Sequence, residues 1–126
     1  MIPYGRQDIS QADIDSVIEV LRSDFLTQGP LVERFELALS HYTGAKHTVA
    51  VNSATSALHL ACLALGVSSG DLVWTSPITF VASANCALYC GADIDFVDIE
   101  MFSNNMSIIA LREKLQQAKA LGRLPK

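Results

Sequence analysis

The stretch from Asn52 to Gly66 reads Asn-Ser-Ala-Thr-Ser-Ala-Leu-His-Leu-Ala-Cys-Leu-Ala-Leu-Gly, and the rest of the chain can be organised around it. It follows residues 48–51, Thr-Val-Ala-Val, a run typical of a buried strand. Its first residues are small or carry hydroxyl groups, and the remainder is apolar and strongly helix-forming as far as Gly66. The sequence therefore predicts a strand at 48–51, a tight turn, and a helix at 56–65.

The turn between this strand and this helix is a candidate anion site. A helix that starts after a strand leaves backbone N–H groups free at its first turn, and the helix dipole favours negative charge there. The hydroxyl groups of Ser53, Thr55 and Ser56 would add donors. One hypothesis is that the turn holds a phosphate. The alternative is that serine and threonine only cap the helix.

The alternation of strand and helix continues toward the C-terminus. Residues 72–75 and 94–97 read as short buried strands, and residues 79–89 and 110–121 read as helices. This order predicts parallel strands joined by right-handed crossovers, and strands without polar alternation need cover on both faces. We therefore expect an α/β fold of three layers around a mostly parallel sheet.

Two helices are expected before the first strand. Ser10 and Asp13 are typical of a capping box that starts a helix ending near residue 22, and Pro30 suits the first turn of a helix closed by Gly44. The loop between them is either a ligand loop or an ordinary connector. We expect a helical segment over residues 1–45 and the start of a βαβαβ core over residues 46–126.

Composition excludes several classes of protein. Half of the 126 residues are hydrophobic, the net charge is −4, and the nine basic residues are scattered. Neither nucleic acid nor an anionic membrane surface is an expected partner. No apolar run approaches the roughly 20 residues that span a bilayer, and the N-terminus does not read as a signal peptide. A cytoplasmic location is expected.

The sequence predicts no metal centre. The three cysteines, at 62, 86 and 90, read as small buried hydrophobes, because no Cys-x-x-Cys pair is present. His59 in the middle of a predicted helix reads as a packed or partly exposed side chain rather than a base. Four acids surround the third predicted strand, namely Asp93, Asp95, Asp98 and Glu100. They could bind a metal, but the ordinary interpretation is that they keep the strand edge and the adjoining turn solvated.

Phe80 is the one aromatic residue placed to act on a ligand of the Ser/Thr turn. It lies just after the carboxyl end of the second predicted strand, and ligands of parallel sheets bind at carboxyl ends. Its ring could stack on a planar ligand. The alternative is that Phe80 belongs to the core.

Several motifs in a fixed order resemble the DegT/DnrJ/EryC1 sugar aminotransferases, which are pyridoxal-phosphate enzymes of fold type I. Leu-Thr-Gln-Gly-Pro at 26–30 is similar to a subgroup of transaminases in pseudaminic acid biosynthesis. The other motifs are Asn-Ser-Ala-Thr-Ser-Ala-Leu at 52–58, Ala-Leu-Gly at 64–66, Gly-Asp at 70–71, Ser-Pro-Ile-Thr-Phe-Val-Ala-Ser-Ala-Asn at 76–85 and Asp-Phe-Val-Asp-Ile at 95–99.

The resemblance implies a role for individual residues. Thr55 and Ser56 match positions that bind the phosphate of pyridoxal 5'-phosphate, and Phe80 matches the aromatic residue that stacks on its pyridine ring. Positions near the nucleotide-sugar substrate correspond to Tyr4, Asp24, Phe25, Leu26, Thr27 and Ala54.

The resemblance also implies an activity, namely transfer of an amino group from a donor such as glutamate to a nucleotide-linked 4-keto sugar, by a homodimer. In the family this runs through a Schiff-base lysine, and an acid pairs with the pyridine nitrogen. Both positions fall beyond residue 126, and none of the four lysines (46, 114, 119 and 126) lies in a matching context. We therefore expect the N-terminal portion of a large domain, without a catalytic residue and inactive alone. The alternative is a non-catalytic α/β binding or interaction module.

Overall fold

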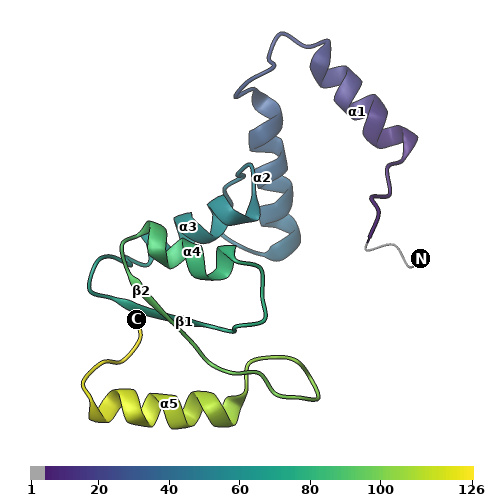
Figure 1. Cartoon of the computed structure of the whole chain (residues 1–126). Helices are drawn as coiled ribbons and strands as arrows, with labels where there is room; N and C mark the ends of the chain where they lie inside the picture. The colour runs from purple at the N-terminus through teal and green to yellow at the C-terminus, as the bar shows by residue number, and fades with distance from the viewer. Residues whose placement is uncertain (1–4) are drawn as a thin grey trace. The chain divides into compact units, whose positions relative to one another are not determined.

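The computed structural model describes residues 5–126, which form two compact units that divide between Ala50 and Val51. Tyr4 lies outside the described residues. The first unit contains helices α1 (Gln11–Leu21) and α2 (Pro30–Thr43). The second unit contains, in order, α3 (Ala54–Ala64), β1 (Leu72–Thr75), α4 (Ala82–Tyr89), β2 (Asp93–Phe96) and α5 (Ile108–Ala120), all labelled in Figure 1.

The two helices of the first unit begin and end as the sequence predicts. The Ser10 hydroxyl accepts a hydrogen bond from the Asp13 N–H at 3.3 Å, and the Asp13 carboxylate accepts one from the Ser10 N–H at 2.8 Å. This reciprocal pair confirms the capping box. Pro30 occupies the first position of α2, and Gly44 closes that helix with a φ of +72°, which favours glycine.

The prediction of a strand at residues 48–51 is wrong. These residues have no strand partner among the described part of the chain, where β1 pairs only with β2. Instead, Glu36 of α2 holds this segment: its carboxylate accepts a hydrogen bond from the Ala50 N–H at 2.7 Å, and its backbone carbonyl accepts one from the Thr48 hydroxyl. A strand requires a hydrogen-bonding neighbour, so β propensity alone did not suffice here.

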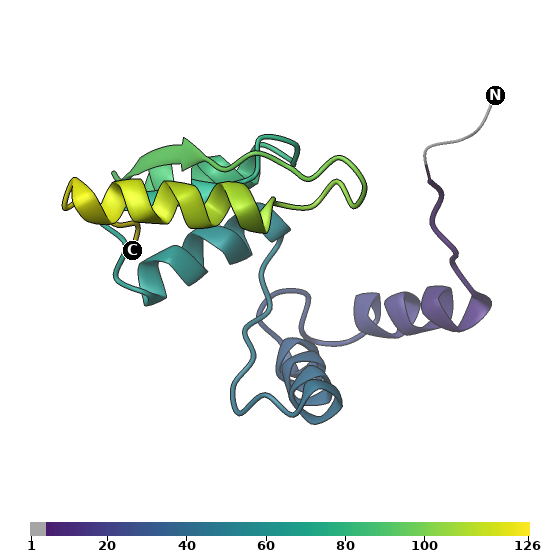
Figure 2. The same ribbon diagram turned by 90° about the horizontal axis from the view of Figure 1, so that it is seen from below.

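The second unit is built around a parallel pair of strands. Leu72 of β1 faces Asp93 of β2, and Thr75 faces Phe96 at the other end. Helix α4 packs on both strands and α3 packs on α4, while α5 lies across the opposite face of the sheet, as Figures 1 and 2 show. The predicted three-layer α/β arrangement with parallel strands is therefore confirmed.

The core of this unit is small and made of small side chains. Val67, Ala87 and Ala92 form its centre, and Val97 is the largest side chain that is fully buried. Helix α4 begins at Ala82, later than the predicted residue 79, and a turn precedes it in which the Phe80 carbonyl accepts a hydrogen bond from the Ser83 N–H at 3.0 Å.

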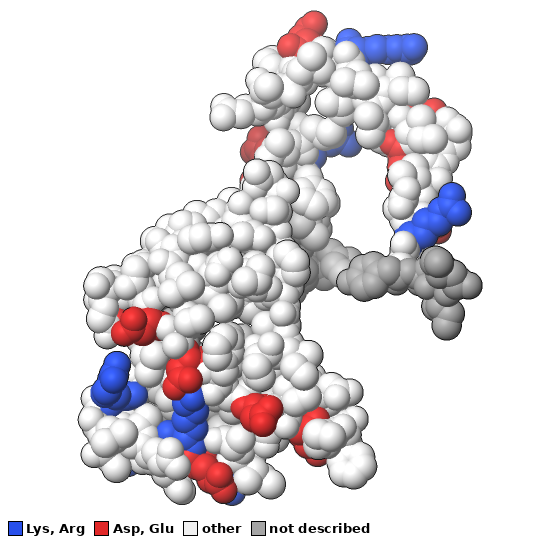
Figure 3. All heavy atoms as spheres, viewed as in Figure 1, with Lys and Arg blue, Asp and Glu red and all other residues white. Residues whose placement is uncertain are grey.

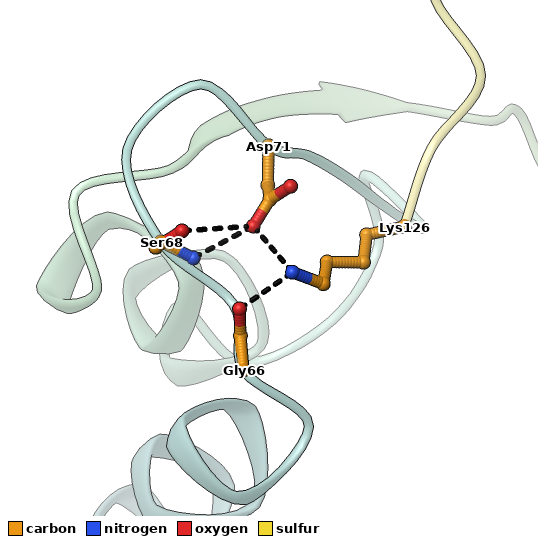
Figure 4. Close-up of polar contacts among 4 residues, drawn as sticks. All are labelled: Gly66, Ser68, Asp71 and Lys126. Atoms are coloured by element: carbon orange, nitrogen blue, oxygen red, sulfur yellow. Dashed lines mark hydrogen bonds and ion pairs between the residues drawn. The ribbon is translucent and has the colours of Figure 1, made fainter.

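The residues after α5 return to the free edge of β1. The Lys126 N–H donates to the Leu72 carbonyl at 2.9 Å, whereas β2 bonds to the carbonyls of Asp71 and Thr75. Because alternate carbonyls of a strand point to opposite edges, Lys126 lies on the edge that β2 leaves open. Figure 4 shows its side chain bridging the Gly66 carbonyl at 2.5 Å and the Asp71 carboxylate at 2.9 Å.

Large apolar side chains remain exposed on most helices. Helices α1, α2 and α3 contain no fully buried residue. Helices α3 and α4 contain no Asp, Glu, Lys or Arg, and Figure 3 shows a surface largely free of charge over them. None of the helices described is long and apolar enough to cross a membrane.

Candidate functional site

The first turn of α3 is organised by three side chains that hydrogen-bond to one another. Ser53 is the N-cap, and its hydroxyl accepts from the Ser56 N–H at 3.2 Å. The Ser56 hydroxyl donates to the Asn52 side-chain carbonyl at 2.8 Å and lies 3.0 Å from the Ser53 hydroxyl. The predicted cap is therefore present, and Asn52 fixes the hydroxyl of Ser56.

The same turn leaves donors available for a ligand. Among the described residues, the backbone N–H groups of Ala54 and Thr55 and the Thr55 hydroxyl take part in no hydrogen bond. They stand at the positive end of the α3 dipole. These groups fit a phosphate of a cofactor: the two N–H groups and the hydroxyl are donors, and no side chain of residues 52–56 carries a negative charge.

Phe80 does not belong to the core. Its side chain is 74% exposed, and it lies in the turn between β1 and α4, next to Thr79, whose hydroxyl is 3.0 Å from the Ser83 hydroxyl in the first turn of α4. The core alternative for this residue is therefore wrong. An exposed ring after the carboxyl end of a parallel strand is free to stack on a planar ligand. No hydrogen bond of the described residues joins this turn to the first turn of α3.

At the carboxyl end of β1 and in the residue that follows it, two polar atoms are buried without a hydrogen-bond partner. They are the Trp74 indole Nε1 and the Ser76 hydroxyl oxygen. Buried polar atoms in proteins nearly always have a hydrogen-bond partner, either another protein group or an ordered water. The carboxyl end of β1 therefore holds hydrogen-bonding capacity that the described residues do not use.

The predicted substrate loop lies in the first unit. Phe25 and Leu26 line a hollow of about 300 Å³ together with residues of α1 and α2, whereas Asp24 and Thr27 are exposed and do not line it. Gly29 packs directly against Phe25: a Cβ atom at Gly29 would stand 2.6 Å from the Phe25 Cβ. The contact between Gly29 and Phe25 was not predicted from the sequence, although a glycine four residues after an aromatic residue in a loop was a usable signal.

Of the four acids around β2, Asp95 forms an ion pair within this structure. Asp95 pairs with Lys114 of α5 at 2.6 Å, and Lys114 Nζ also donates to the Phe96 carbonyl at 2.6 Å. The Lys114 ammonium group, followed by the Phe96 N–H, lowers the pKa of Asp95. Within residues 5–126, no group of three or more His, Cys, Asp or Glu side chains is arranged to hold a metal ion.

His59 of α3 packs on Tyr89 of α4, edge to face, with ring centroids 5.4 Å apart. The prediction of a packed or partly exposed side chain is confirmed, since His59 is half-buried. Two of the lysines are engaged in ion pairs, Lys114 with Asp95 and Lys126 with Asp71.

The chain is similar to known proteins over most of its length. Residues 7–121 match the DegT/DnrJ/EryC1/StrS aminotransferase family. A UDP-4-amino-4,6-dideoxy-N-acetyl-β-L-altrosamine transaminase of Campylobacter jejuni is 49% identical over 104 residues, which is 82% of this chain. The chain spans 27% of the length of that relative.

Solved structures share the fold. PseC of Helicobacter pylori, an aminotransferase involved in pseudoaminic acid biosynthesis, superposes with a TM-score of 0.81 at 37% identity over 88% of this chain and 30% of its own. Spr1654 of Streptococcus pneumoniae, solved in PLP and PMP forms, gives a TM-score of 0.82 at 38% identity. In the PLP form, the match covers 89% of this chain and 29% of that one. The predicted fold is therefore confirmed: this chain shares the fold of the part of these fold type I sugar aminotransferases that it matches.

Proposed function

The chain belongs to the DegT/DnrJ/EryC1/StrS aminotransferase family, and on this premise we propose that it contributes the cofactor-phosphate site of a nucleotide-sugar aminotransferase. The observation that carries the proposal is the first turn of α3, where the Ala54 and Thr55 N–H groups and the Thr55 hydroxyl are free to donate. In this proposal residues 1–45 are a helical lead-in, and residues 46–126 begin the large domain.

Each residue of the turn has a distinct role in the proposal. Thr55 donates to the phosphate through its backbone and its hydroxyl, and Ser56 donates once its hydroxyl exchanges Asn52 for the anion. Phe80 covers one face of the pyridine ring and excludes water from it. Pyridoxal phosphate, when bound, supplies the electron sink for amino-group transfer.

The proposed acceptor is a nucleotide-linked 4-keto sugar and the donor an amino acid such as glutamate. The name of the Campylobacter jejuni relative, a transaminase of a UDP-linked amino sugar, supports this choice. In the proposal, Tyr4, Ala54 and the loop from Asp24 to Thr27 contact the sugar. Within that loop, Phe25 and Leu26 present apolar surface to a hollow of about 300 Å³ that could receive part of it.

We also propose that the 126-residue chain does not transaminate on its own. None of its four lysines matches the family's Schiff-base position, and Lys114 and Lys126 are held by Asp95 and Asp71. The proposed working state is a homodimer in the cytoplasm, for which the exposed apolar side chains of α1 and α2 offer surface.

Thermal unfolding with and without pyridoxal phosphate tests the phosphate site. The wild-type chain should be stabilised by the cofactor, because a ligand that binds only the folded state raises the unfolding temperature. The Thr55→Val, Ser56→Ala double variant should lose this shift. Ser107→Ala is the matched control: it removes the N-cap of α5, whose hydroxyl accepts from the Ala110 N–H at 3.2 Å, and should keep the full shift.

Equal stabilisation of wild type and double variant would refute the phosphate site. The absence of any shift in wild type would favour the non-catalytic binding module instead. Borohydride treatment provides a second readout: a cofactor fixed covalently to one of the four lysines would contradict the proposal that no Schiff-base lysine is present.

A further inference from the structure

Residues 98–107, between β2 and α5, fold back on themselves as an ordered hairpin, which we call the arm. Its two sides meet in an antiparallel bridge between Ile99 and Met106. Nearer the tip, the Glu100 N–H donates to the Asn105 carbonyl at 2.8 Å. Figures 1 and 2 show the arm extending past the first turn of α5. Its conformation is therefore set before any partner binds, which lowers the entropy cost of binding.

The tip of the arm exposes two large apolar side chains. Phe102 is 95% exposed, more than any other large apolar side chain among residues 5–126, and its neighbour Met101 is 84% exposed. Adjacent apolar side chains that an ordered backbone holds in solvent offer a ready contact surface. The tip is therefore suited to enter an apolar recess.

Helix α5 provides an apolar recess, a hollow of about 400 Å³. Ile108, Leu111 and Leu115 line it from one face of the helix, and Leu124, beyond the helix end, completes its apolar lining. The arm of the same chain does not fill this hollow, because Phe102 remains exposed. Within the described part of the chain, the tip and the hollow therefore each present apolar surface to solvent.

The arm and the hollow also differ in the sign of their charge. The arm includes two exposed acids, Asp98 and Glu100, and no lysine or arginine. The charged residues that line the hollow are Arg112 and Lys119, which are exposed and take no part in the two ion pairs of the described residues. The two surfaces are therefore complementary in polarity and in charge, and such complementarity steers association and disfavours other partners.

We propose that the arm of one copy of this chain docks into the α5 hollow of a second copy, and that the two copies exchange this contact across a two-fold axis. Phe102 and Met101 enter the hollow, and Glu100 faces the basic residues that line it. The arm ends at Ser107, and Ile108 of the hollow follows directly in the sequence, so the base of the arm adjoins the hollow. One two-fold pairing can therefore satisfy both surfaces of both copies.

This contact does not rest on the proposed function, because it involves neither the first turn of α3 nor Phe80. It is also separate from the apolar side chains of α1 and α2, which were proposed above as the surface of a homodimer. A homodimer through α1 and α2 would persist in every arm variant. Loss of the arm contact should therefore halve the mass of the assembly, whether or not that homodimer forms.

Analytical ultracentrifugation of the 126-residue chain over a range of concentrations tests the contact. Phe102→Asp and Ile108→Asp each place a negative charge in the apolar contact and should weaken association about tenfold or more. Both changed side chains are exposed, and aspartate suits the first turn of a helix, so circular dichroism should match that of wild type. Ile109→Asp is the matched control. Ile109 lies in the same turn with similar exposure but does not line the hollow, so this variant should assemble as wild type does.

A mixture of the two disrupted variants distinguishes exchange from unspecific association. Phe102→Asp keeps an intact hollow and Ile108→Asp keeps an intact arm, so the mixture should regain one of the two contacts and associate where neither variant does alone. The charges have their own test. Glu100→Lys and Arg112→Glu should each weaken association, and the two changes combined in one chain should restore it.

Equal masses of wild type and Phe102→Asp at every concentration would overturn the proposal, since a second copy would then not be the occupant of the hollow. A mixture of Phe102→Asp and Ile108→Asp that stays apart would overturn the exchange. Dissociation of Ile109→Asp to the same extent as Ile108→Asp would overturn the hollow as the docking site.

Discussion

Lys126 and Asp71 are 55 residues apart in the sequence, yet the Lys126 Nζ lies 2.9 Å from the Asp71 carboxylate. The same ammonium group donates to the Gly66 carbonyl at the end of α3, and the Lys126 N–H donates to Leu72 at the start of β1. One residue thus joins the turn that follows α3 to the open edge of the sheet (Figure 4).

Lys126→Met should lower the unfolding temperature slightly, and Asp71→Asn should do the same. The pair is partly exposed, and exposed ion pairs contribute little, so the effect should shrink further in high salt. Differential scanning fluorimetry at low and high salt measures it. Lys46→Met, which changes an exposed lysine without an ion pair in the described structure, should have no effect. Additive losses in a Lys126→Met, Asp71→Asn double variant would mean that the two side chains do not interact.

Lys114→Met should cost about 0.5–1 kcal/mol of unfolding free energy. The change removes the ion pair with Asp95, the hydrogen bond to the Phe96 carbonyl and the contact of Nζ with the Trp74 ring, 5.1 Å from its centre. Urea denaturation measures the loss. Lys114→Arg keeps the charge and should recover part of it. A Met variant as stable as wild type would show that α5 is held by apolar contacts alone.

Stability should fall when the pH drops below about 4. Lys126 and Lys114 hold the pKa values of Asp71 and Asp95 below the ordinary value of 3.8. A lowered folded-state pKa contributes stability that is complete above the unfolded-state pKa and is lost as the pH falls through the folded-state pKa. The Lys114→Met, Lys126→Met double variant should therefore show a shallower acid dependence, measured as unfolding free energy between neutral and acidic pH. A slope identical to that of wild type would contradict this account.

Gly29→Ala should destabilise the first unit by about 1 kcal/mol. Gly29 has a φ of −79°, which alanine adopts readily, so the cost is steric: the new methyl group meets the Phe25 Cβ at 2.6 Å. A Cβ atom is fixed to the backbone and cannot swing aside. Gly5→Ala is the matched control, because nothing lies within 4 Å of its added Cβ. Thermal unfolding compares the two, and Phe25→Gly should rescue Gly29→Ala. Equal stability of the two alanine variants would show that the loop moves freely.

Ser53→Ala should shorten α3 and cost about 1 kcal/mol, because the Ser56 N–H loses its acceptor. Ser53→Asp should keep the cap, since aspartate accepts the same hydrogen bond, but should weaken phosphate binding through its charge. Circular dichroism measures the helix, and cofactor-induced stabilisation measures the site. If Ser53→Asp bound the cofactor as wild type does, the anion would not sit at this turn.

The sequence predicted those parts of the fold that local pattern controls. Helix α3 was predictable from its apolar run and from Gly66, and the parallel order of β1 and β2 from the helix between them. The strand at 48–51 failed, because strand formation depends on a distant partner that local sequence does not reveal. The hydrogen bond from Ala50 to Glu36 and the ion pair of Lys126 with Asp71 could not be predicted for the same reason, because each joins residues that are distant in the sequence.

The candidate site was predicted in its residue types but not in its detail. The hydroxyl groups at the start of the predicted helix indicated a cap, which Ser53 provides. The role of Asn52, which takes up the Ser56 hydroxyl, depends on side-chain geometry and was not foreseen. The exposure of Phe80 could not be predicted from the sequence, because phenylalanine is usually buried in proteins.

Trp74 is the single tryptophan of the chain, and it lines the hollow between the sheet and α5 with Lys114 above its ring. Tryptophan fluorescence of this chain therefore originates from the contact between the sheet and α5 and reports on that contact. A red shift and altered quenching of its emission would follow detachment of α5 from the sheet, even if α3 and α4 remained packed. The chain thus contains its own optical probe for distinguishing loss of one layer from unfolding of the whole unit.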